Sequence, residues 1–382
     1  MKSSMNRQRV RGVQSAATIA PKGDGRFGVC AGRARAAVPL AIIGGGAAGL
    51  FAAAEAARRR LPCLLVERKA RLAAKLLMTA NGRCNFTRDV SPERFLADLG
   101  PAAPFATEAI RDCPPRRVIE TMRSLGVGVR RMQDGRMFPA DGKAATVVHA
   151  FGDFLRERAV PILTNCPVTG LVALKQGFSV ATPNFSFQAE NVLVATGGVS
   201  YPKTGSVGDG QEFAKAFGHR IVPYRPGLIG LETSDARVVS LAGRRFEDGR
   251  VTLYSGGRAV FDYAGEVDFE RFGLSGAAIY NAQRFIMHNA LRDWELEVAA
   301  GGERMRFGAL RSRPLKEAIV TLGGVATDEI DPATMESRLV PHLYFAGEVM
   351  DIDGPTGGYN LTLAFATARK AVAAICENVR GS

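Results

Sequence analysis

The sequence contains no hydrophobic run of the length that crosses a membrane. Its longest apolar runs, Val38 to Leu50 and Ile319 to Val325, fall short of the roughly 18 residues that a spanning helix needs, and glycine interrupts both. The 6 cysteines are scattered without a CxxC pair, which argues against a disulfide framework and against a zinc site. We therefore expect a chain without a membrane span that works in the reducing environment of the cytoplasm.

Several catalytic motifs are also missing. None of the 4 histidines lies in an HExxH or HxxE pattern, so no metal site is predicted, and His219 and His342 are expected to be structural. No serine has the surroundings of a nucleophile elbow, and hydrolysis is therefore not supported. The sequence therefore contains no motif from which a catalytic acid or base could be assigned.

Acidic residues are too few to balance the basic ones, and the formal net charge is +13. Residues 1–37 carry 8 basic side chains against the single acid Asp24, which gives +7 (8 − 1) and leaves +6 for the rest of the chain. This stretch has no secretory h-region and no helical or strand period, so we predict a disordered basic extension, with a transit-like address and an upstream start codon as alternatives. Because over half of the excess charge lies there, the charge does not favour a nucleic acid as the partner.

The organised chain begins with a strand, a glycine turn and a helix. The apolar strand 38–43 leads into Gly44-Gly45-Gly46-Ala47-Ala48-Gly49 and an alanine-rich helix. In this arrangement Gly44 allows the tight turn, Gly46 leaves room for a pyrophosphate, and Gly49 lets the helix lie close to the strand. A second strand, 61–66, then delivers Glu67, whose carboxylate would accept both hydroxyls of an adenosine ribose. An acid at this position favours FAD or NAD over NADP.

Two later segments distinguish between FAD and NAD. A buried strand, 191–198, ends in Ala-Thr-Gly-Gly, and a much later strand, 342–353, contains Gly347-Glu348 and precedes a glycine turn and the helix 361–376. A dinucleotide fold that returns to its own site so late in the chain is typical of FAD enzymes, whose long ligand is held at both ends. The turn into the helix, at Gly357-Gly358, would present N–H groups and a positive dipole to the N1 and C2 carbonyl region of a flavin. We therefore expect FAD, bound noncovalently.

Three motifs carry a resemblance to a known family. They are KLLMTANGRCN at 75–85, ATGGVSYPKTGS at 195–206, and YFAGE with the following DGPTGGYNL within 344–361. In this order they resemble the BaiN/RdsA family of bacterial NAD(P)/FAD-dependent oxidoreductases, over about residues 38–380. The resemblance implies a glutathione-reductase-like FAD domain interrupted by an inserted domain, NADH or NADPH as a transient donor, and a small-molecule substrate. One relative is linked to the reduction of unsaturated bile-acid intermediates.

The chain departs from the family pattern at two places. Ala80-Asn81 stands where the family usually has a glycine pair, which leaves the backbone of that loop less certain. The segment 277–320 is shorter than the helical segment of other members. The subdomain that covers the substrate side is therefore expected to be reduced or absent.

The predicted fold class is α/β: a three-layer Rossmann-like FAD/NAD(P)-binding domain, with a parallel sheet and a β-meander at 168–190, and an inserted β-rich domain. Within the insertion, glycine turns at 256–257 and 301–302 indicate hairpins, and 277–291 indicates one helix. The expected order along the chain is a disordered extension (1–37), a first FAD-binding part (38–199), an inserted substrate-side domain (200–318) and a second FAD-binding part (319–382).

The candidate cofactor-binding residues come from the glycine turn, the acid after it and the three motifs. As in similar flavoproteins, Glu348 is expected on the ribityl hydroxyls and the backbone near Val168 at the adenine. Arg83 and Lys75 would neutralise FAD phosphates or orient an anionic substrate, or else pair on the surface. Cys84 has no second cysteine near it in sequence and is expected to be a small buried residue rather than a redox thiol. The full candidate set is Gly44, Gly45, Gly46, Ala47, Ala48, Gly49, Glu67, Arg68, Lys75, Arg83, Cys84, Asn85, Val168, Ala195, Thr196, Gly197, Gly347, Glu348, Gly358, Asn360 and Leu361.

These observations predict a flavin-dependent oxidoreductase in which FAD takes a hydride from a reduced nicotinamide and passes it to an organic acceptor. No second glycine motif is framed by a strand and a helix, so the nicotinamide is not expected to have a complete binding domain of its own. Two alternatives stay open: an RNA-modifying flavoprotein, which the pI of 9.8 invites, and a flavin-binding regulatory protein without turnover. The motifs do not encode the acceptor, the choice of donor or the oligomeric state.

Overall fold

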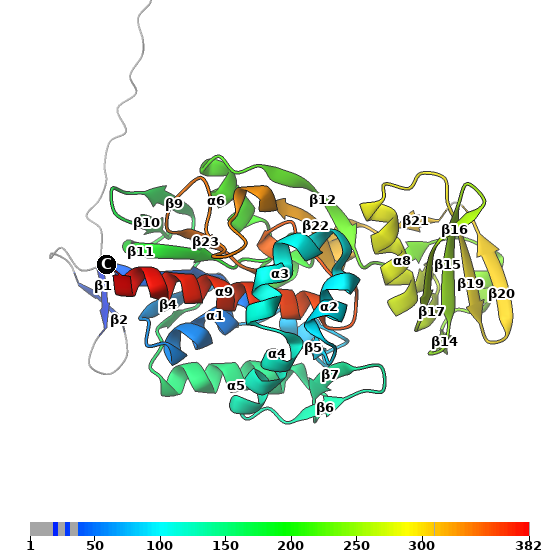
Figure 1. The fold of residues 1–382 in the computed structure, drawn as a ribbon, viewed down its shortest axis with the longest axis horizontal. Helices are drawn as coiled ribbons and strands as arrows, with labels where there is room; N and C mark the ends of the chain where they lie inside the picture. The colour runs from blue at the N-terminus through cyan, green and yellow to red at the C-terminus, as the bar shows by residue number, and fades with distance from the viewer. Residues whose placement is uncertain (1–17, 22–26, 31–36, 309, 382) are drawn as a thin grey trace, which may run out of the picture.

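A computed structural model describes residues 18–21, 27–30, 37–308 and 310–381 (Figure 1). Within the extension predicted to be disordered, it describes two short antiparallel strands, β1 (Thr18–Pro21) and β2 (Phe27–Cys30). The prediction of disorder is therefore wrong for these two segments, which pair from Thr18 with Cys30 to Pro21 with Phe27. The rest of the predicted extension through residue 36 lies outside the described residues.

The nucleotide-binding layer is a 7-stranded sheet, and the predicted parallel arrangement is confirmed. β3 (Val38–Ile43) lies between β4 (Cys63–Val66) and β11 (Ser186–Val194) and is parallel to both. β8 (Ile162–Leu163) continues the parallel order beyond β4. The four residues of β4 and the last four of β3 are buried, as expected for strands covered on both faces.

One long strand takes the place of two that the sequence suggests. The predicted meander and the predicted strand 191–198 share β11: its first residues pair antiparallel with β10 (Phe178–Ala181), and its last three pair parallel with β23 (Leu343–Phe345). β9 (Gly170–Ala173) completes the meander on the other side of β10. β23, from the far end of the chain, therefore enters the sheet beside β11. β11 in turn pairs with β3, the strand that leads into the glycine turn.

The sheet is covered by helices that begin and end close to the predicted positions. α1 (Ala47–Arg58) packs along α9 (Tyr359–Gly381), and Figure 1 shows the two helices side by side. Between β4 and β8 lies a lobe of helices and short strands. The first α-helix of this lobe begins at Pro92 with a serine N-cap: Ser91 accepts a hydrogen bond from the N–H of Arg94 at 3.2 Å, and Pro92 occupies the first turn. The lobe contains β5 (Thr87–Arg88), α2 (Pro92–Leu99), α3 (Ala103–Asp112), α4 (Pro115–Ser124), β6 (Val129–Arg131), β7 (Arg136–Pro139) and α5 (Ala144–Glu157).

The inserted region has a hydrophobic core of its own, which lies at the far end of the molecule in Figure 1. An antiparallel ribbon of β12 (Ile221–Gly227) and β22 (Val320–Val325) leads into and out of it. One sheet has 5 short strands and the other has 4, and α8 (Ala277–His288) packs against them. The sheets have the orders β14 (Arg245–Phe246), β17 (Val267–Glu270), β18 (Gly273–Ser275), β13 (Leu231–Glu232), β21 (Arg311–Ser312), and β16 (Arg258–Ala264), β15 (Arg250–Ser255), β19 (Glu295–Ala300), β20 (Glu303–Phe307).

The two predicted hairpin turns are present, at 256–257 between β15 and β16 and at 301–302 between β19 and β20. After the first hairpin, the β-rich run 259–269 holds parts of two strands. It divides into β16 and β17, which belong to different sheets, and Gly265 between them donates its N–H to the carbonyl of Gly249 at 2.8 Å. Within the short segment 277–320 the structure builds α8, β19, β20 and β21, and the other strands of the two sheets precede it. The expectation that the subdomain covering the substrate side is reduced or absent stays a prediction. The predicted domain boundaries stay a proposal.

Short helices complete the chain. They are α6 (Asp209–Ala216), α7 (Ala236–Ser240), and the 3-10 helices Leu76–Met78, Gly100–Ala102, Pro202–Thr204, Leu315–Glu317, Thr327–Glu329 and Gly347–Val349. Within the described ranges, no helix combines the length and the hydropathy needed to cross a membrane.

Candidate functional site

The glycine turn has the geometry that its sequence predicts. Gly44 has a φ of +107°, and a Cβ on it would lie 2.5 Å from the carbonyl oxygen of Ala195. A Cβ on Gly49 would lie 1.8 Å from the carbonyl oxygen of Gly44, so the helix can approach the strand only without a side chain there. Gly46 differs from both, because a Cβ on it would meet no atom within 4 Å. The structure therefore needs two of the glycines for packing and leaves open space at the third.

Glu67 lies beside this turn, at the end of β4. Its Oε2 accepts the N–H of Gly45 and its Oε1 accepts the N–H of Lys69, both at 2.7 Å, and the residue is buried. These two bonds fix the carboxylate and leave one lone pair on each oxygen. Glu67 and Val168 line the same small cavity of about 60 Å³, together with Gly44 and Gly46. The predicted adenosine end of the site is thus brought together.

A larger cavity of about 440 Å³ continues from Gly46 toward the inserted domain. Most of the predicted residues line it, from segments far apart in the sequence. They are Gly46, Ala47, Ala48, Lys75, Arg83, Asn85, Ala195, Thr196, Gly197, Gly347, Glu348, Gly358, Asn360 and Leu361. All three motifs of the family resemblance therefore meet on one cavity.

The N-terminus of α9 opens onto this cavity. Gly357 and Gly358 have φ values of +111° and +99°, and a Cβ on Gly358 would lie 2.5 Å from the carbonyl carbon of Thr87. The turn is therefore held against β5 at a distance that only glycine permits. Gly358, Asn360 and Leu361 line the cavity, so the positive end of the helix dipole is directed at it, which suits an electron-rich edge of a ligand.

Lys75 and Glu348 bind each other across the floor of the cavity. Lys75 Nζ lies 2.6 Å from Glu348 Oε2 and donates to Ser200 Oγ at 2.8 Å, while Glu348 Oε1 accepts the N–H of Thr321 at 2.7 Å. The sequence predicts Lys75 as a cation for phosphate and Glu348 as an acceptor for ribityl hydroxyls, without an interaction between the two. Their ion pair places the charge of Lys75 next to a carboxylate.

Other predicted residues support the site or lie outside it. Cys84 is fully buried at a φ of +58° and is not among the residues that line either cavity, and burial raises the pKa of its thiol to about 12. Asn360 braces the preceding loop through bonds to Gly354. Arg68 lines the small cavity and pairs with Asp209 at 2.5 Å, and Arg83 is exposed over the ring of Phe138 at 5.4 Å. The thiol of Cys84 therefore packs in the core, as expected of a small buried residue, and its assignment to the cofactor site stays a prediction.

The inserted domain contributes a wall of charged and aromatic side chains that sequence reasoning missed. Arg245 donates to both oxygens of Asp268, at 2.7 and 2.9 Å, and lies 3.9 Å from Glu266. Burial raises the pKa of Glu266 above its ordinary value, and the charge of Asp268 raises it further. Tyr280 and Phe272 line the same wall. The residues come from different strands and from α8, with no spacing in the sequence that could have indicated them.

Residues with a left-handed backbone also line the cavity: Ala80, Asn81, Tyr201 and Leu228 have φ values between +49° and +56°. Tyr201 has φ +51° and ψ 57°, a left-handed conformation that is rare for an aromatic residue. Its carbonyl accepts the N–H and the hydroxyl of Thr204, which hold the turn in this conformation. Backbone strain of this kind is concentrated at functional sites.

The described residues fit an FAD molecule. The open space at Gly46 is where a pyrophosphate would lie, Glu67 has acceptors left for ribose hydroxyls, and the start of α9 offers donors at the other end. The two cavities share Gly46, Lys75, Ala195 and Thr196, and together they give an elongated site.

Comparison with known proteins agrees with this geometry. A 3-dehydro-bile acid delta(4,6)-reductase from Clostridium scindens is 27% identical over 408 residues, which cover 88% of this chain and 99% of that protein. A ribosomal RNA dihydrouridine synthase from Escherichia coli is 28% identical over 389 residues, which cover 86% of this chain and 95% of that protein.

The likeness extends to solved structures and to a family profile. A crystal structure of 3-ketosteroid delta1-dehydrogenase from Sterolibacterium denitrificans matches with a TM-score of 0.58 at 12% identity, covering 89% of this chain and 99% of that chain, and shows the fold alone. The profile described as the HI0933-like protein Rossmann domain matches residues 38–374. The family resemblance and the Rossmann-like fold predicted from the three motifs are therefore confirmed, and the chain belongs to the HI0933-like family.

Proposed function

We propose that the protein is an FAD-dependent oxidoreductase that reduces a carbon–carbon double bond conjugated with a carbonyl group, with NADH or NADPH as the donor. The observation that carries this proposal is the single cavity between the glycine turn, the start of α9 and the charged wall of the inserted domain. The names of the relatives support the type of bond. One is a delta(4,6)-reductase of a 3-dehydro-bile acid and the other forms dihydrouridine, so a ring double bond is reduced in both.

FAD, when bound, supplies the hydride-transfer chemistry, and the chain holds and orients it. Glu67 would accept ribose hydroxyls, the N–H groups at the start of α1 would donate to the pyrophosphate, and the start of α9 would donate to the flavin. Lys75 and Glu348 hold each other at the floor of the cavity, so that neither presents an uncompensated charge there. We propose that the protein works in the cytoplasm, a reducing compartment, and the free thiols of Cys63, Cys84, Cys113, Cys166 and Cys376 support this.

Glu266 is the group that we propose returns a proton to the substrate. Reduction of such a double bond adds a hydride to one carbon and a proton to the other, and the proton donor has to be neutral before it acts. Glu266 faces the cavity, and its partner Arg245 directs both of its short bonds to Asp268. The raised pKa of Glu266 keeps a proton on its carboxyl at higher pH than an exposed glutamate would.

The test begins with FAD content and continues with turnover. Purified protein loaded with FAD is assayed for oxidation of NADH and NADPH with a panel of cyclic enones. Glu266→Gln should lower enone turnover by about 100-fold, the lower range for general-acid catalysis, while reduction of the bound FAD by the donor stays within a few-fold. Glu303→Gln, at the exposed first residue of β20 in the inserted domain, is the matched control and should leave both rates unchanged. Failure to take up FAD, or full activity of Glu266→Gln, would contradict the proposal at two different steps.

An RNA uridine is a second candidate acceptor, because two curated relatives form dihydrouridine in ribosomal RNA. Arg83 and Arg136 line the cavity, and Arg130 and Arg131 are exposed on the neighbouring strand β6. Arginines at the rim of a site would attract phosphates. Incubation of the FAD-loaded protein with ribosomal RNA and NADPH, followed by mass spectrometry for dihydrouridine, separates this acceptor from a small molecule. The non-catalytic alternative is contradicted by turnover of either one.

A further inference from the structure

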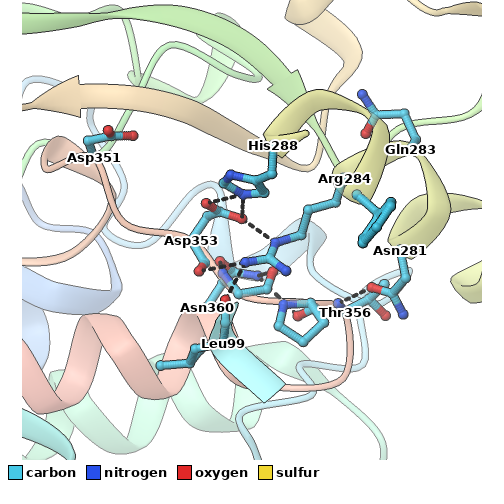
Figure 2. Close-up of polar contacts among 12 residues, drawn as sticks. Leu99, Asn281, Gln283, Arg284, His288, Asp351, Asp353, Thr356 and Asn360 are labelled. Atoms are coloured by element: carbon cyan, nitrogen blue, oxygen red, sulfur yellow. Dashed lines mark hydrogen bonds and ion pairs between the residues drawn. The ribbon is translucent and has the colours of Figure 1, made fainter. Parts of the chain in front are cut away.

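The inserted domain is tied to the FAD-binding domain by a buried charged cluster on α8. Arg284 and Asp353 form a close ion pair through Arg284 Nε, and Arg284 Nη2 donates to the carbonyls of Leu99 and Asp353 at 2.7 and 3.2 Å. His288 Nε2 lies 3.0 Å from the other oxygen of Asp353. Figure 2 shows both α8 side chains reaching Asp353. Asp353 and Arg284 are almost fully buried, at 3% and 9% exposure.

A second bond joins the same two segments. Asn281 Oδ1 accepts the N–H of Thr356 at 2.9 Å, so α8 holds the loop 352–358 at two points (Figure 2). This loop connects the 3-10 helix after β23 with the start of α9. Ile352, Thr356, Gly357 and Gly358 line the large cavity. The loop is therefore a wall of the end of the cavity where we place the flavin.

The helix α8 presents different residues to its two sides. Tyr280, Arg284 and His288 recur every four residues and therefore share one face, which is directed at the FAD-binding domain and the cavity. Ala278, Ile279, Ala282 and Ile286 pack into the core of the inserted domain. A shift of α8 would consequently move Tyr280, which lines the cavity, together with Arg284 and His288, which contact Asp353.

We propose that Arg284, His288 and Asp353 form a latch that positions the substrate-side wall relative to the flavin-side loop. The three are positioning residues, because none of them lines the cavity itself. A salt bridge this deeply buried is a poor source of stability compared with apolar packing, whereas its fixed geometry can specify one arrangement of two parts. The expected effect of the latch on enone turnover rests on the proposed oxidoreductase function, whereas its expected effect on amide hydrogen exchange does not.

Three variants test the latch in the full-length, FAD-loaded protein. Asp353→Asn keeps the shape of the side chain and removes its charge, and Arg284→Gln removes the partner. Arg369→Gln is the matched control, since Arg369 pairs with buried Glu55 at 2.6 Å between α1 and α9, away from both cavities. Circular dichroism and FAD content establish that each variant is folded.

The first readout is amide hydrogen exchange of peptides from 277–288 and 350–358. Both latch variants should exchange at least about 10-fold faster than the parent in these two segments and at the parent rate in β3 and β15. The second readout is enone reduction, where kcat/KM should fall by about 10- to 100-fold, as expected for a misplaced wall, while the FAD dissociation constant changes less than about 5-fold. Exchange in the two segments no faster than in Arg369→Gln would overturn the latch. Faster exchange with no enone turnover in the parent would leave the latch standing and reject the proposed acceptor.

Discussion

Gly46 offers a sharp test of the nucleotide site, because the structure separates its role from that of its neighbours. A Cβ at Gly46 would meet no atom within 4 Å, and the residue has extended backbone angles, φ −80° and ψ −163°, which suit a β-branched side chain. Gly46→Val should therefore change the free energy of unfolding of the FAD-free protein by no more than about 1 kcal/mol, since the lower entropy of the unfolded chain offsets the loss of a glycine N-cap.

The effect on cofactor binding should be much larger. The isopropyl group would fill the open space in which we place the pyrophosphate, and we expect the FAD dissociation constant to rise at least about 100-fold, or about 2.8 kcal/mol. Gly44→Ala should give the opposite pattern and lose stability even without FAD, since its Cβ would lie 2.5 Å from the Ala195 carbonyl oxygen at a φ of +107°.

Urea unfolding of the FAD-free proteins and fluorescence titration with FAD measure the two effects separately. Gly152→Val is the matched control, because Gly152 lies in α5 and its Cβ would also meet no atom within 4 Å. It should bind FAD like the parent. If Gly46→Val bound FAD with the parent's affinity, the glycine turn would not be the pyrophosphate site. If it unfolded as readily as Gly44→Ala, the space at Gly46 would not be open.

Two further predictions concern groups away from the turn. Cys84→Ser should keep donor-driven FAD reduction within several-fold of the parent, because the thiol is buried and its pKa is raised to about 12; a loss of orders of magnitude with normal FAD content would require a thiol relay instead. The pKa of Asp353 is lowered, because the bonds and charges of His288 and Arg284 outweigh the opposing effect of burial. The contribution of the ionised Asp353 carboxylate to the free energy of unfolding should be complete above the unfolded pKa of about 4 and be lost as pH falls through the lower folded pKa. The difference in unfolding free energy between the parent and Asp353→Asn should therefore narrow from pH 6 to pH 3. A constant difference would contradict this.

The nucleotide-binding half could be predicted because its signals are local. A strand, a glycine turn and a helix follow one another, and Gly49 is required by a contact within this unit, with the carbonyl oxygen of Gly44. Gly44 combines a local requirement, its φ of +107°, with a distant one, because a Cβ on it would clash with the backbone of Ala195. Glu67 follows at the end of the next strand, so its place beside the turn is fixed by parallel pairing of β3 with β4. The meander was predictable from its turns, although the sequence could not indicate that its third strand continues as the parallel strand β11.

Side-chain partners within the site were less predictable than the backbone that carries them. Lys75 and Glu348 were each placed correctly at the cavity, yet they are separated by 273 positions, and no pattern in the sequence reveals that they bind each other. Cys84 lies inside a motif of the family resemblance, yet its side chain is fully buried and its backbone is left-handed at φ +58°. Membership of a motif therefore locates a loop without deciding which of its side chains face the ligand.

The orientation of the inserted domain is the feature least encoded in local patterns. The recurrence of Tyr280, Arg284 and His288 every four residues could have indicated a polar face on the helix 277–291, but the residue that this face meets, Asp353, lies 69 positions beyond Arg284. A buried arginine is costly without a partner, so the two segments must be brought together wherever this helix packs. The glycine turn can therefore be assigned from sequence alone, whereas assigning the substrate-side wall requires knowing which carboxylate anchors α8.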